Sequence, residues 1–277
     1  MEIFDSKLLK DLKLPGANSK KGENGQITII GGSELFHGAP LLALTAASRF
    51  VDMVYFSSPE KSVGEIANSI KSKLFSFIWV PWNEVDSYIE KSDAVLIGPG
   101  LMRYRSEKST EEERIACDET CRESSRVTEK FLKKFPEKKW VIDGGALQIL
   151  EKEWIPEGAI LTPNSKEYKG LFGEIDPSVA AKEYKCVIVD KRPVTKVCSP
   201  SRCIEIPGGN AGLTKGGTGD VQAGLTVALL AKNDPFLAGS TASYLVKKAA
   251  DSLFDKVGTA YNADDLSLEV VKEFCKE

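Results

Sequence analysis

The sequence predicts an α/β fold in which helices cover both faces of a mostly parallel β-sheet. Short apolar runs rich in valine and isoleucine recur along the chain, each bounded by glycine, proline or aspartate, and segments of helical periodicity lie between them. Continuous apolar runs are typical of strands buried on both faces, as in parallel sheets with helical crossovers. Since no repeat or linker interrupts this alternation, we expect a single domain over residues 1–277.

The first half of the chain supplies most of the predicted sheet. Its apolar runs predict strands over residues 26–30, 53–56, 77–80, 94–97 and 140–142. Helical periodicity predicts helices over residues 40–50, 60–71, 83–90 and 110–135, and a short helix within residues 1–12. The stretch 103–139 mixes charges of both signs, which is typical of a solvated helix face, and we assign it no chemistry.

The second half predicts an edge to the sheet and two closing helices. Closely spaced apolar runs at residues 187–189, 195–198 and 203–206 indicate strands that form an antiparallel edge. Apolar helices are expected over residues 220–231 and 237–254.

Composition excludes several classes of function. The 37 Lys and Arg residues against 40 Asp and Glu residues create no positive field for nucleic acid or anionic lipid, so we expect neither partner. No apolar run approaches the roughly 20 residues of a membrane-spanning helix. The single histidine, His37, excludes a zinc site built from several histidines. At this length we expect the chain to be stable without disulfide support. Six cysteines with no CxxC pair and no dense framework make a reducing cytosol the simplest compartment.

The densest chemical signal is the glycine-rich segment 208–220 (GGNAGLTKGGTGD), which runs into a predicted helix. Glycines let successive backbone N–H groups turn inward, and a helix N-terminus adds about half a positive charge. The segment therefore predicts an anion cradle. It is not a P-loop, because Asp220 follows the glycines where that motif has Lys followed by Ser or Thr.

Asp220 has two interpretations. An aspartate in the first turn of a helix can simply cap it. Beside a cradle for a phosphoryl group, the same carboxylate can take the proton of a hydroxyl that attacks phosphorus, and the surrounding glycines favour this second role.

Six short segments in a consistent order resemble the ribokinase-like NAD(P)H-hydrate dehydratases, which depend on ADP or ATP. The resemblance extends from Lys20 to about Leu266. It is carried by GGS at 31–33 with GA at 38–39, GPGL at 98–101, D-x-x-A-L from Asp143, LTPN-x-x-E at 161–167, K-x-x-x-T at 191–195 and GGTGD at 216–220.

The resemblance implies a three-layer α/β/α sandwich that restores NADH or NADPH from its C6-hydrated form. It implies that the hydrated nicotinamide nucleotide contacts Ala39, Gly100, Asn164 and Asp220. It assigns the adenine nucleotide to Lys191, Arg192, Pro193, Val194, Thr195 and Gly219. It also implies a homo-oligomer, commonly a tetramer, with small-molecule substrates.

The required chemistry needs a base, an anion hole and a divalent ion. Phosphorylation makes the hydroxyl a good leaving group, and the ring nitrogen then expels phosphate. Asp220 would be the base, and the amides of Gly217, Thr218 and Gly219 the anion hole. Glu167 would hold Mg²⁺ through water, or would form only a surface salt bridge.

Several assignments stay open. Asn164 either contacts substrate or caps a helix that begins near Ser165. Lys191 and Lys215 could both reach phosphates, and the motif favours Lys191. Arg192 and Pro193 depart from the nucleotide segment of the family, and glycines after Asp143 leave the role of that segment undecided.

Two other functions compete with the dehydratase. The same site would suit a ribokinase-like kinase that phosphorylates a thiazole or pyrimidine alcohol. A catalytically silent nucleotide-binding protein is a third possibility, which the aspartate beside the glycines disfavours.

Overall fold

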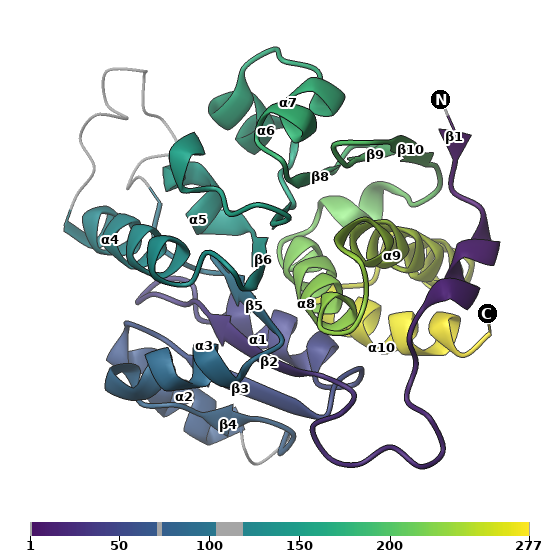
Figure 1. The fold of residues 1–277 in the computed structure, drawn as a ribbon. Helices are drawn as coiled ribbons and strands as arrows, with labels where there is room; N and C mark the ends of the chain where they lie inside the picture. The colour runs from purple at the N-terminus through teal and green to yellow at the C-terminus, as the bar shows by residue number, and fades with distance from the viewer. Residues whose placement is uncertain (1, 71–73, 104–118, 277) are drawn as a thin grey trace.

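The computed structural model describes residues 2–70, 74–103 and 119–276, and within them the strands form one ten-stranded sheet (Figure 1). The order across the sheet is β1-β10-β9-β8-β7-β6-β5-β2-β3-β4. The strands are β1 (Glu2–Ile3), β2 (Gln26–Ile30), β3 (Met53–Ser57), β4 (Ile78–Trp79), β5 (Ala94–Ile97), β6 (Lys139–Ile142), β7 (Ile160–Leu161), β8 (Val187–Asp190), β9 (Thr195–Cys198) and β10 (Cys203–Ile206).

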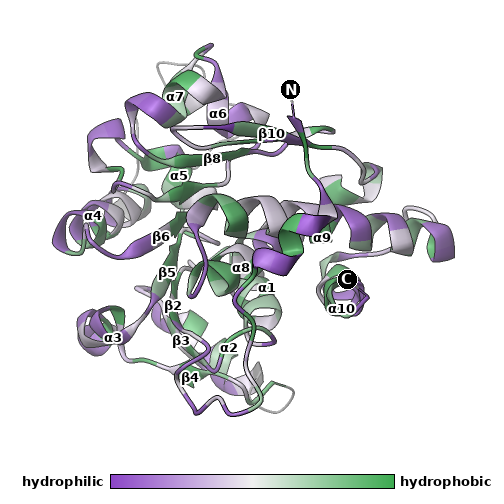
Figure 2. Ribbon diagram, turned by 45° about the vertical axis from the view of Figure 1, so that its right-hand side comes forward, coloured by the Kyte–Doolittle hydropathy of each residue, from purple (hydrophilic) through white to green (hydrophobic). Residues whose placement is uncertain are grey.

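Helices cover both faces of the sheet, which makes the predicted three-layer sandwich (Figure 2). One face carries α1 (Gly38–Ala47), α2 (Lys61–Ile70), α8 (Thr218–Leu230), α9 (Pro235–Val257) and α10 (Ala263–Phe274). The other carries α3 (Val85–Lys91), α4 (Glu119–Lys134), α5 (Gly144–Ile149), α6 (Ser165–Phe172) and α7 (Pro177–Glu183). In the described part of the chain, no helix is both long and apolar enough to cross a membrane.

Strand side chains divide between the two apolar layers with the period of two that a strand imposes. In β2, Ile27 and Ile29 join the cluster under α1 and α8, whereas Ile30 joins the cluster under α3 and α4. In β6, Val141 faces the first cluster and Trp140 the second. Because both sides of each strand are buried, the strands read as continuous apolar runs in the sequence.

The connection order places a switch point between β2 and β5. From β2 the chain builds outward through β3 and β4, and then returns to β5 on the other side of β2. All strands from β4 across to β8 are parallel. At such a switch point the loops after the two central strands diverge, so their carboxyl ends border a crevice in which ligands bind.

Most predicted elements are confirmed, and the departures lie at the N-terminus, at the C-terminal helix α10 and at short elements of the second half. Residues 1–12, expected as a helix, form β1 and the 3₁₀-helix η1 (Ser6–Asp11), since β1 pairs with β10. This pairing also removes β10 from the edge of the sheet. The sequence analysis missed β7, α5, α7 and α10. Of the helix expected over 110–135, residues 110–118 lie outside the described residues.

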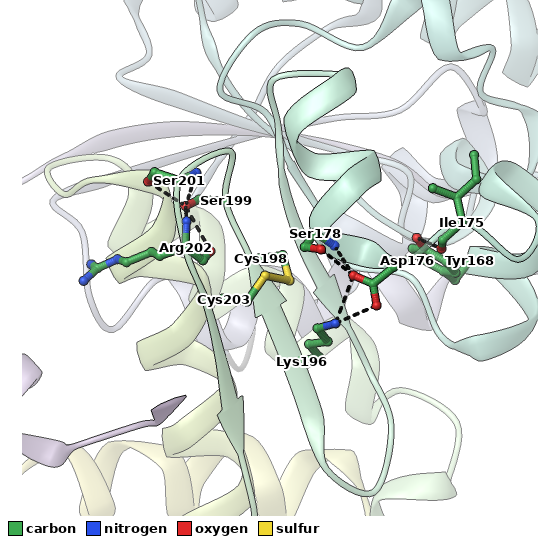
Figure 3. The surroundings of a disulfide bond; sticks show 10 residues. All are labelled: Tyr168, Ile175, Asp176, Ser178, Lys196, Cys198, Ser199, Ser201, Arg202 and Cys203. Carbon is green, nitrogen blue, oxygen red and sulfur yellow. Dashed lines mark hydrogen bonds and ion pairs between the residues drawn. A yellow bond between two sulfur atoms is a disulfide. The ribbon is translucent and has the colours of Figure 1, made fainter. Parts of the chain in front are cut away.

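The structure contains disulfides, which the cysteine pattern of the sequence did not indicate. Cys198 and Cys203 are bonded, with Cα atoms 4.1 Å apart, and they stand directly opposite each other in β9 and β10 (Figure 3). Cys121 is also disulfide-bonded. The sequence shows only a spacing of five residues; the antiparallel register brings the two side chains together. Cys186 is a buried free thiol whose pKa burial raises to about 12.

The contact between α1 and α8 depends on Gly224. A Cβ atom there would lie 2.1 Å from the carbonyl oxygen of Ala43, so nothing larger than glycine fits. We expect Gly224→Ala to lower the free energy of unfolding by about 1–3 kcal/mol, the usual cost of overpacking a buried contact. Denaturant unfolding measures this.

The matched control is Gly170→Ala in α6, where an added Cβ meets nothing within 4 Å. That change should be neutral or stabilising by up to about 1 kcal/mol, because alanine favours a helix over glycine. Equal effects of the two substitutions would contradict the close approach of α1 and α8.

Candidate active site

Two cavities open at the carboxyl ends of the parallel strands and share one junction. The first cavity, of about 550 Å³, is bordered by the loops after β2, β5 and β6. The second cavity, of about 690 Å³, lies between the segments after β8 and β10 and the helices α8 and α9. Asn164, Lys191 and Gly219 line both cavities. A group at this junction therefore faces whatever each cavity binds.

Glycines allow the loops at the switch point to touch. The amide N–H of Gly32 donates to the carbonyl oxygen of Pro99 at 2.8 Å. Gly98 has φ 121°, and a Cβ atom there would stand 1.8 Å from the carbonyl oxygen of Asp143. At Gly100 a Cβ atom would stand 2.3 Å from the carbonyl oxygen of Phe36. These contacts bring the loops after β2, β5 and β6 together into one wall of the first cavity.

Lys191 is the cation at the junction. Its Nζ donates to Oδ1 of Asp143 at 3.0 Å, and the side chains are 19% and 4% exposed. The same carboxylate oxygen accepts from the hydroxyl of Thr162 at 2.6 Å. Burial alone would lower the pKa of Lys191, but the carboxylates of Asp143 and Glu167 raise it, so the ammonium stays charged.

Asn164 and Glu167 form a capping box on α6. The side-chain oxygen of Asn164 accepts from the amides of Lys166 and Glu167 at 2.9 and 3.0 Å, and Oε2 of Glu167 accepts from the amide of Asn164 at 2.9 Å. The sequence left open whether Asn164 caps a helix or contacts substrate. In the structure it caps α6, and it also lines both cavities. Burial raises the pKa of Glu167, and Oε1 accepts from Gln148 at 3.2 Å.

Asp220 faces the first cavity and is no cap. The N-cap of α8 is Gly217, and no side chain caps that helix. Burial and the carboxylate of Asp143 raise the pKa of Asp220 to about 7, and the ammonium of Lys191 opposes the rise. A carboxyl group with that pKa is half ionised near neutral pH, which suits a general base.

The start of α8 presents free backbone donors. Gly217 has φ 91°, in the left-handed region, and a Cβ atom there would stand 2.4 Å from Leu42. Within the described residues, no hydrogen bond is recorded from the amides of Gly217 and Gly219. The amide of Thr218 donates to the carbonyl oxygen of Lys215 at 3.4 Å. The Thr218 hydroxyl is turned to the carbonyl oxygens of Leu213 and Lys215, at 2.7 and 2.9 Å.

The glycine-rich segment divides into two parts, which corrects the single cradle expected over 208–220. The amide of Gly209 donates to Asp251 at 3.0 Å, and that of Gly212 donates to Asn210 at 2.9 Å. These donors are committed inside the protein, so residues 208–212 form a wall of the second cavity. The amides of Gly209 and Gly212 are therefore not available to an anion, unlike those of Gly217 and Gly219.

The segment after β8 forms the opposite wall. Arg192, Pro193 and Thr195 line the second cavity. Val194 is not among the lining residues, and it is 47% exposed. Arg192 pairs through Nε with Oδ2 of the buried Asp190 at 2.7 Å.

Lys215 is directed away from the junction, which separates it from Lys191. Its Nζ donates to the carbonyl oxygens of Thr259 and Tyr261. It therefore binds the connection between α9 and α10, while Lys191 alone of the two lines the cavities.

Comparison with known proteins identifies the fold and the family. A family model described as NAD(P)H-hydrate dehydratase matches residues 27–272. The chain belongs to the NAD(P)H-hydrate dehydratase family. A bifunctional NAD(P)H-hydrate repair enzyme from Methanocaldococcus jannaschii is 33% identical over 268 residues, covering 93% of this chain and 50% of that relative. The chain thus spans about half the length of the first curated relatives that it matches.

Solved structures confirm the ribokinase-like fold of this dehydratase-family chain. A ribokinase-like superfamily protein from Enterococcus faecalis has a TM-score of 0.83 at 20% identity, over 99% of this chain and 95% of that chain. An ADP/ATP-dependent NAD(P)H-hydrate dehydratase from Bacillus subtilis was co-crystallised with ATP and Mg²⁺. Its structure has a TM-score of 0.75 at 23% identity, over 99% of this chain and 98% of that chain. These likenesses show the fold.

On the first cavity of this dehydratase-family chain, the structure brings together the residues that the motifs singled out. Ala39, Gly100 and Asp220 line it with Glu167. The guanidinium of Arg103 lines it too, 5.8 Å from the ring centre of Phe36, and the sequence analysis gave neither residue a role there.

Sequence analysis also missed Gln222 and Lys247, which line the second cavity and are 7% and 6% exposed. For Gln222 the available signal was an amide side chain inside an otherwise apolar helix; Lys247 stands among other charged residues of α9 and gave no such signal.

Proposed function

We propose that this chain dehydrates C6-hydrated NADH or NADPH back to the reduced coenzyme at the expense of ADP or ATP. The observation that carries the proposal is the junction of the two cavities. There a carboxyl group with a pKa near 7, an ammonium group and the donors at the start of α8 converge. The family supports the choice of substrate.

We assign the two cavities to the two substrates. Ala39, Gly100, Asn164 and Asp220 would contact the hydrated nicotinamide in the first cavity, and Arg103 supplies a positive charge for its diphosphate. The adenine nucleotide would occupy the second cavity, between the 191–195 segment and residues 208–212. Its terminal phosphate would then lie at Gly219 and Lys191, within reach of the C6 hydroxyl.

The reaction begins with phosphoryl transfer. The carboxylate of Asp220 takes the proton of the C6 hydroxyl, whose oxygen attacks the terminal phosphorus of ADP or ATP. The bond between that phosphorus and its bridging oxygen breaks, and AMP or ADP leaves. The amides of Gly217 and Gly219 and the ammonium of Lys191 stabilise the charge on the phosphoryl oxygens.

Elimination completes the dehydration. The lone pair of the ring nitrogen expels phosphate from C6, which forms a carbon–nitrogen double bond. Transfer of a proton from C5 to solvent then places the double bond between C5 and C6 and restores the dihydropyridine. The net change is loss of water from the coenzyme and hydrolysis of one phosphoanhydride.

The donor set at the junction fits Mg²⁺ held through water. Within the described residues, no cluster of three or more His, Cys, Asp and Glu side chains is placed to hold a metal by itself. Asp143, Glu167 and Asp220 nevertheless line the same cavity as Lys191, which leaves an excess of negative charge when all are ionised. A divalent ion would offset the charge of the nucleotide phosphates beside these carboxylates. Mg²⁺ typically keeps several waters and binds through one or two carboxylates and the phosphates.

Glu167 and Asp143 would hold this ion, which supplies charge neutralisation of the phosphate oxygens when bound. Lys191 would hold Asp143 in place, and the capping box would hold Glu167.

Incubation of the protein with hydrated NADH, ADP or ATP and Mg²⁺ tests the proposal. We expect the absorbance band of reduced nicotinamide to return, with one phosphate released for each coenzyme restored. Omission of the nucleotide, or addition of a chelator, should abolish the recovery. A protein that leaves the hydrate unchanged, yet phosphorylates a thiazole or pyrimidine alcohol, would be the competing kinase.

We also propose that residues 1–277 act as one dehydratase domain, in a cytoplasmic homo-oligomer such as a tetramer. The continuous sheet supports the single domain. Exposed apolar side chains near the C-terminus, Phe254, Val257 and Leu268, support association of copies. The cytoplasmic location is supported by the metabolic substrates, which are coenzymes of the cell interior.

A further inference from the structure

Lys247 is a buried lysine that the proposed chemistry does not use. It lies in the middle of α9, is 6% exposed and lines the second cavity. Burial lowers its pKa, which Asp251 opposes. A lysine is seldom buried unless its ammonium group has partners, since removing a charge from water is costly. Its partners therefore indicate what it does.

The ammonium of Lys247 joins two segments that are far apart in the sequence. Its Nζ donates to the carbonyl oxygen of Pro193 at 2.5 Å and to that of Gly208 at 2.8 Å. The carbonyl oxygen of Arg192 stands at 3.5 Å. Pro193 belongs to the wall after β8, and Gly208 belongs to the wall after β10. The three protons of one ammonium group thus bind both walls of the second cavity.

Asp251, one helical turn after Lys247, supports the same geometry. Its Oδ2 accepts from the amide of Gly209 at 3.0 Å. Through Lys247 and Asp251, α9 thus binds the carbonyl of Gly208 and the amide of Gly209, both in the wall after β10. Gly209 also packs on the stem of Lys247, because a Cβ atom there would stand 3.1 Å from Lys247 Cγ. Without the ammonium of Lys247, the carbonyl oxygens of Pro193 and Gly208 would lose the donor that they share.

We propose that Lys247 is a positioning residue, which holds the two walls of the second cavity at the separation that the adenine nucleotide needs. This inference rests on the assignment of the nucleotide to that cavity. The residue acts through the backbone of Pro193 and Gly208, and it leaves the first cavity and the junction untouched. Its loss should therefore weaken nucleotide binding and spare both the hydrated coenzyme and the chemical step.

Lys247→Met tests the inference, because methionine keeps the unbranched stem and removes the ammonium. We expect the KM for ADP and its calorimetric Kd to rise at least about tenfold, since the loops must be ordered at the expense of binding energy. The KM for hydrated NADH and kcat at saturating ADP should stay within about twofold of wild type. A lysine with a merely structural role would lower Tm without separating the two KM values.

Lys248→Met is the matched control. It makes the same change one residue further along α9. The Nζ of Lys248 donates to the hydroxyl of Tyr244, and Lys248 lines neither cavity. Its KM for ADP should equal that of the wild type. If Lys247→Met fails to fold, Lys247→Gln serves instead; it keeps a shorter donor and should raise the KM for ADP at least about threefold.

The outcomes separate this inference from the proposed function. A folded Lys247 variant with an unchanged KM and Kd for ADP would overturn the positioning role. A wild-type protein that binds no adenine nucleotide would instead overturn the proposed function.

Discussion

Asp220→Asn is expected to lower kcat by about 10³-fold or more while the Kd for ADP stays close to that of the wild type. Asparagine keeps the shape of the side chain but cannot take the proton of the C6 hydroxyl. Because burial raises the pKa of Asp220 to about 7, the wild-type kcat/KM should also fall as pH drops below 7. Steady-state rates across pH 5–9 and calorimetry with ADP measure both effects.

The same substitution should stabilise the protein above neutral pH. A carboxyl group whose pKa is raised on folding holds its proton more tightly in the folded state. Its contribution to stability is complete below the ordinary value of 3.8 and is lost as pH rises through about 7. Removal of the ionised group should therefore raise the free energy of unfolding at pH 8 by on the order of 2–4 kcal/mol, and the gain should vanish near pH 4.

Asp255→Asn controls for the loss of a carboxylate, because Asp255 is exposed on α9 and lines neither cavity. It should change neither rate nor the pH dependence of stability. Undiminished turnover in Asp220→Asn would remove this residue from the proposed mechanism. Activity that persists unchanged at pH 5 would contradict the raised pKa.

Lys191→Met is expected to lower kcat by about 10²–10³-fold, the usual effect of removing one donor from a developing anion. The substitution should also shift the pH profile of the rate. The ammonium of Lys191 holds down the pKa of Asp220, so its removal should move the acid limb of the pH profile to higher pH. Rates at saturating ADP, measured across the same pH range, report both effects.

A charge-balanced variant keeps this test informative. Removal of Lys191 alone leaves the buried carboxylate of Asp143 without its cation, which typically costs about 3–5 kcal/mol. Lys191→Met combined with Asp143→Asn restores the balance, so it should fold better; because it also removes a carboxylate proposed to hold Mg²⁺, its low rate has two expected causes. Lys166→Met, at an exposed position on α6, is the control for the substitution itself. Recovery of full activity in the double variant would show that Lys191 acts only by neutralising Asp143.

The strands of the central sheet could be predicted because burial on both faces leaves a direct trace in the sequence. β2, β5, β9 and β10 occupy the predicted residues. β7 is only two residues long, within the short apolar run 159–161, and β1 is held by pairing with β10. Elements whose stability comes from a distant partner carry little local signal.

The candidate site also has some features that the sequence predicts and others that depend on contacts between distant residues. The glycine motifs and Asp220 were visible because tight turns and close backbone approaches demand glycine at defined places. Of the two lysines that could reach phosphates, the motif favoured Lys191, but the sequence did not show where the side chain of Lys215 would point. Folding directs Lys215 to carbonyl oxygens in the connection between α9 and α10 and Lys191 to the junction.

By itself, the sequence determined the α/β class, the parallel core and the helix that begins with GTGD, since these follow from local periodicity and from the conformational freedom of glycine. Only the tertiary structure decided which donors are free. Asp251 and Asn210 accept from the amides of Gly209 and Gly212, which removes these two donors from the predicted anion cradle. The raised pKa of Asp220 likewise comes from burial and from Asp143, which is far away in the chain. Hydrogen-bond partners and desolvation depend on packing, which no local pattern records.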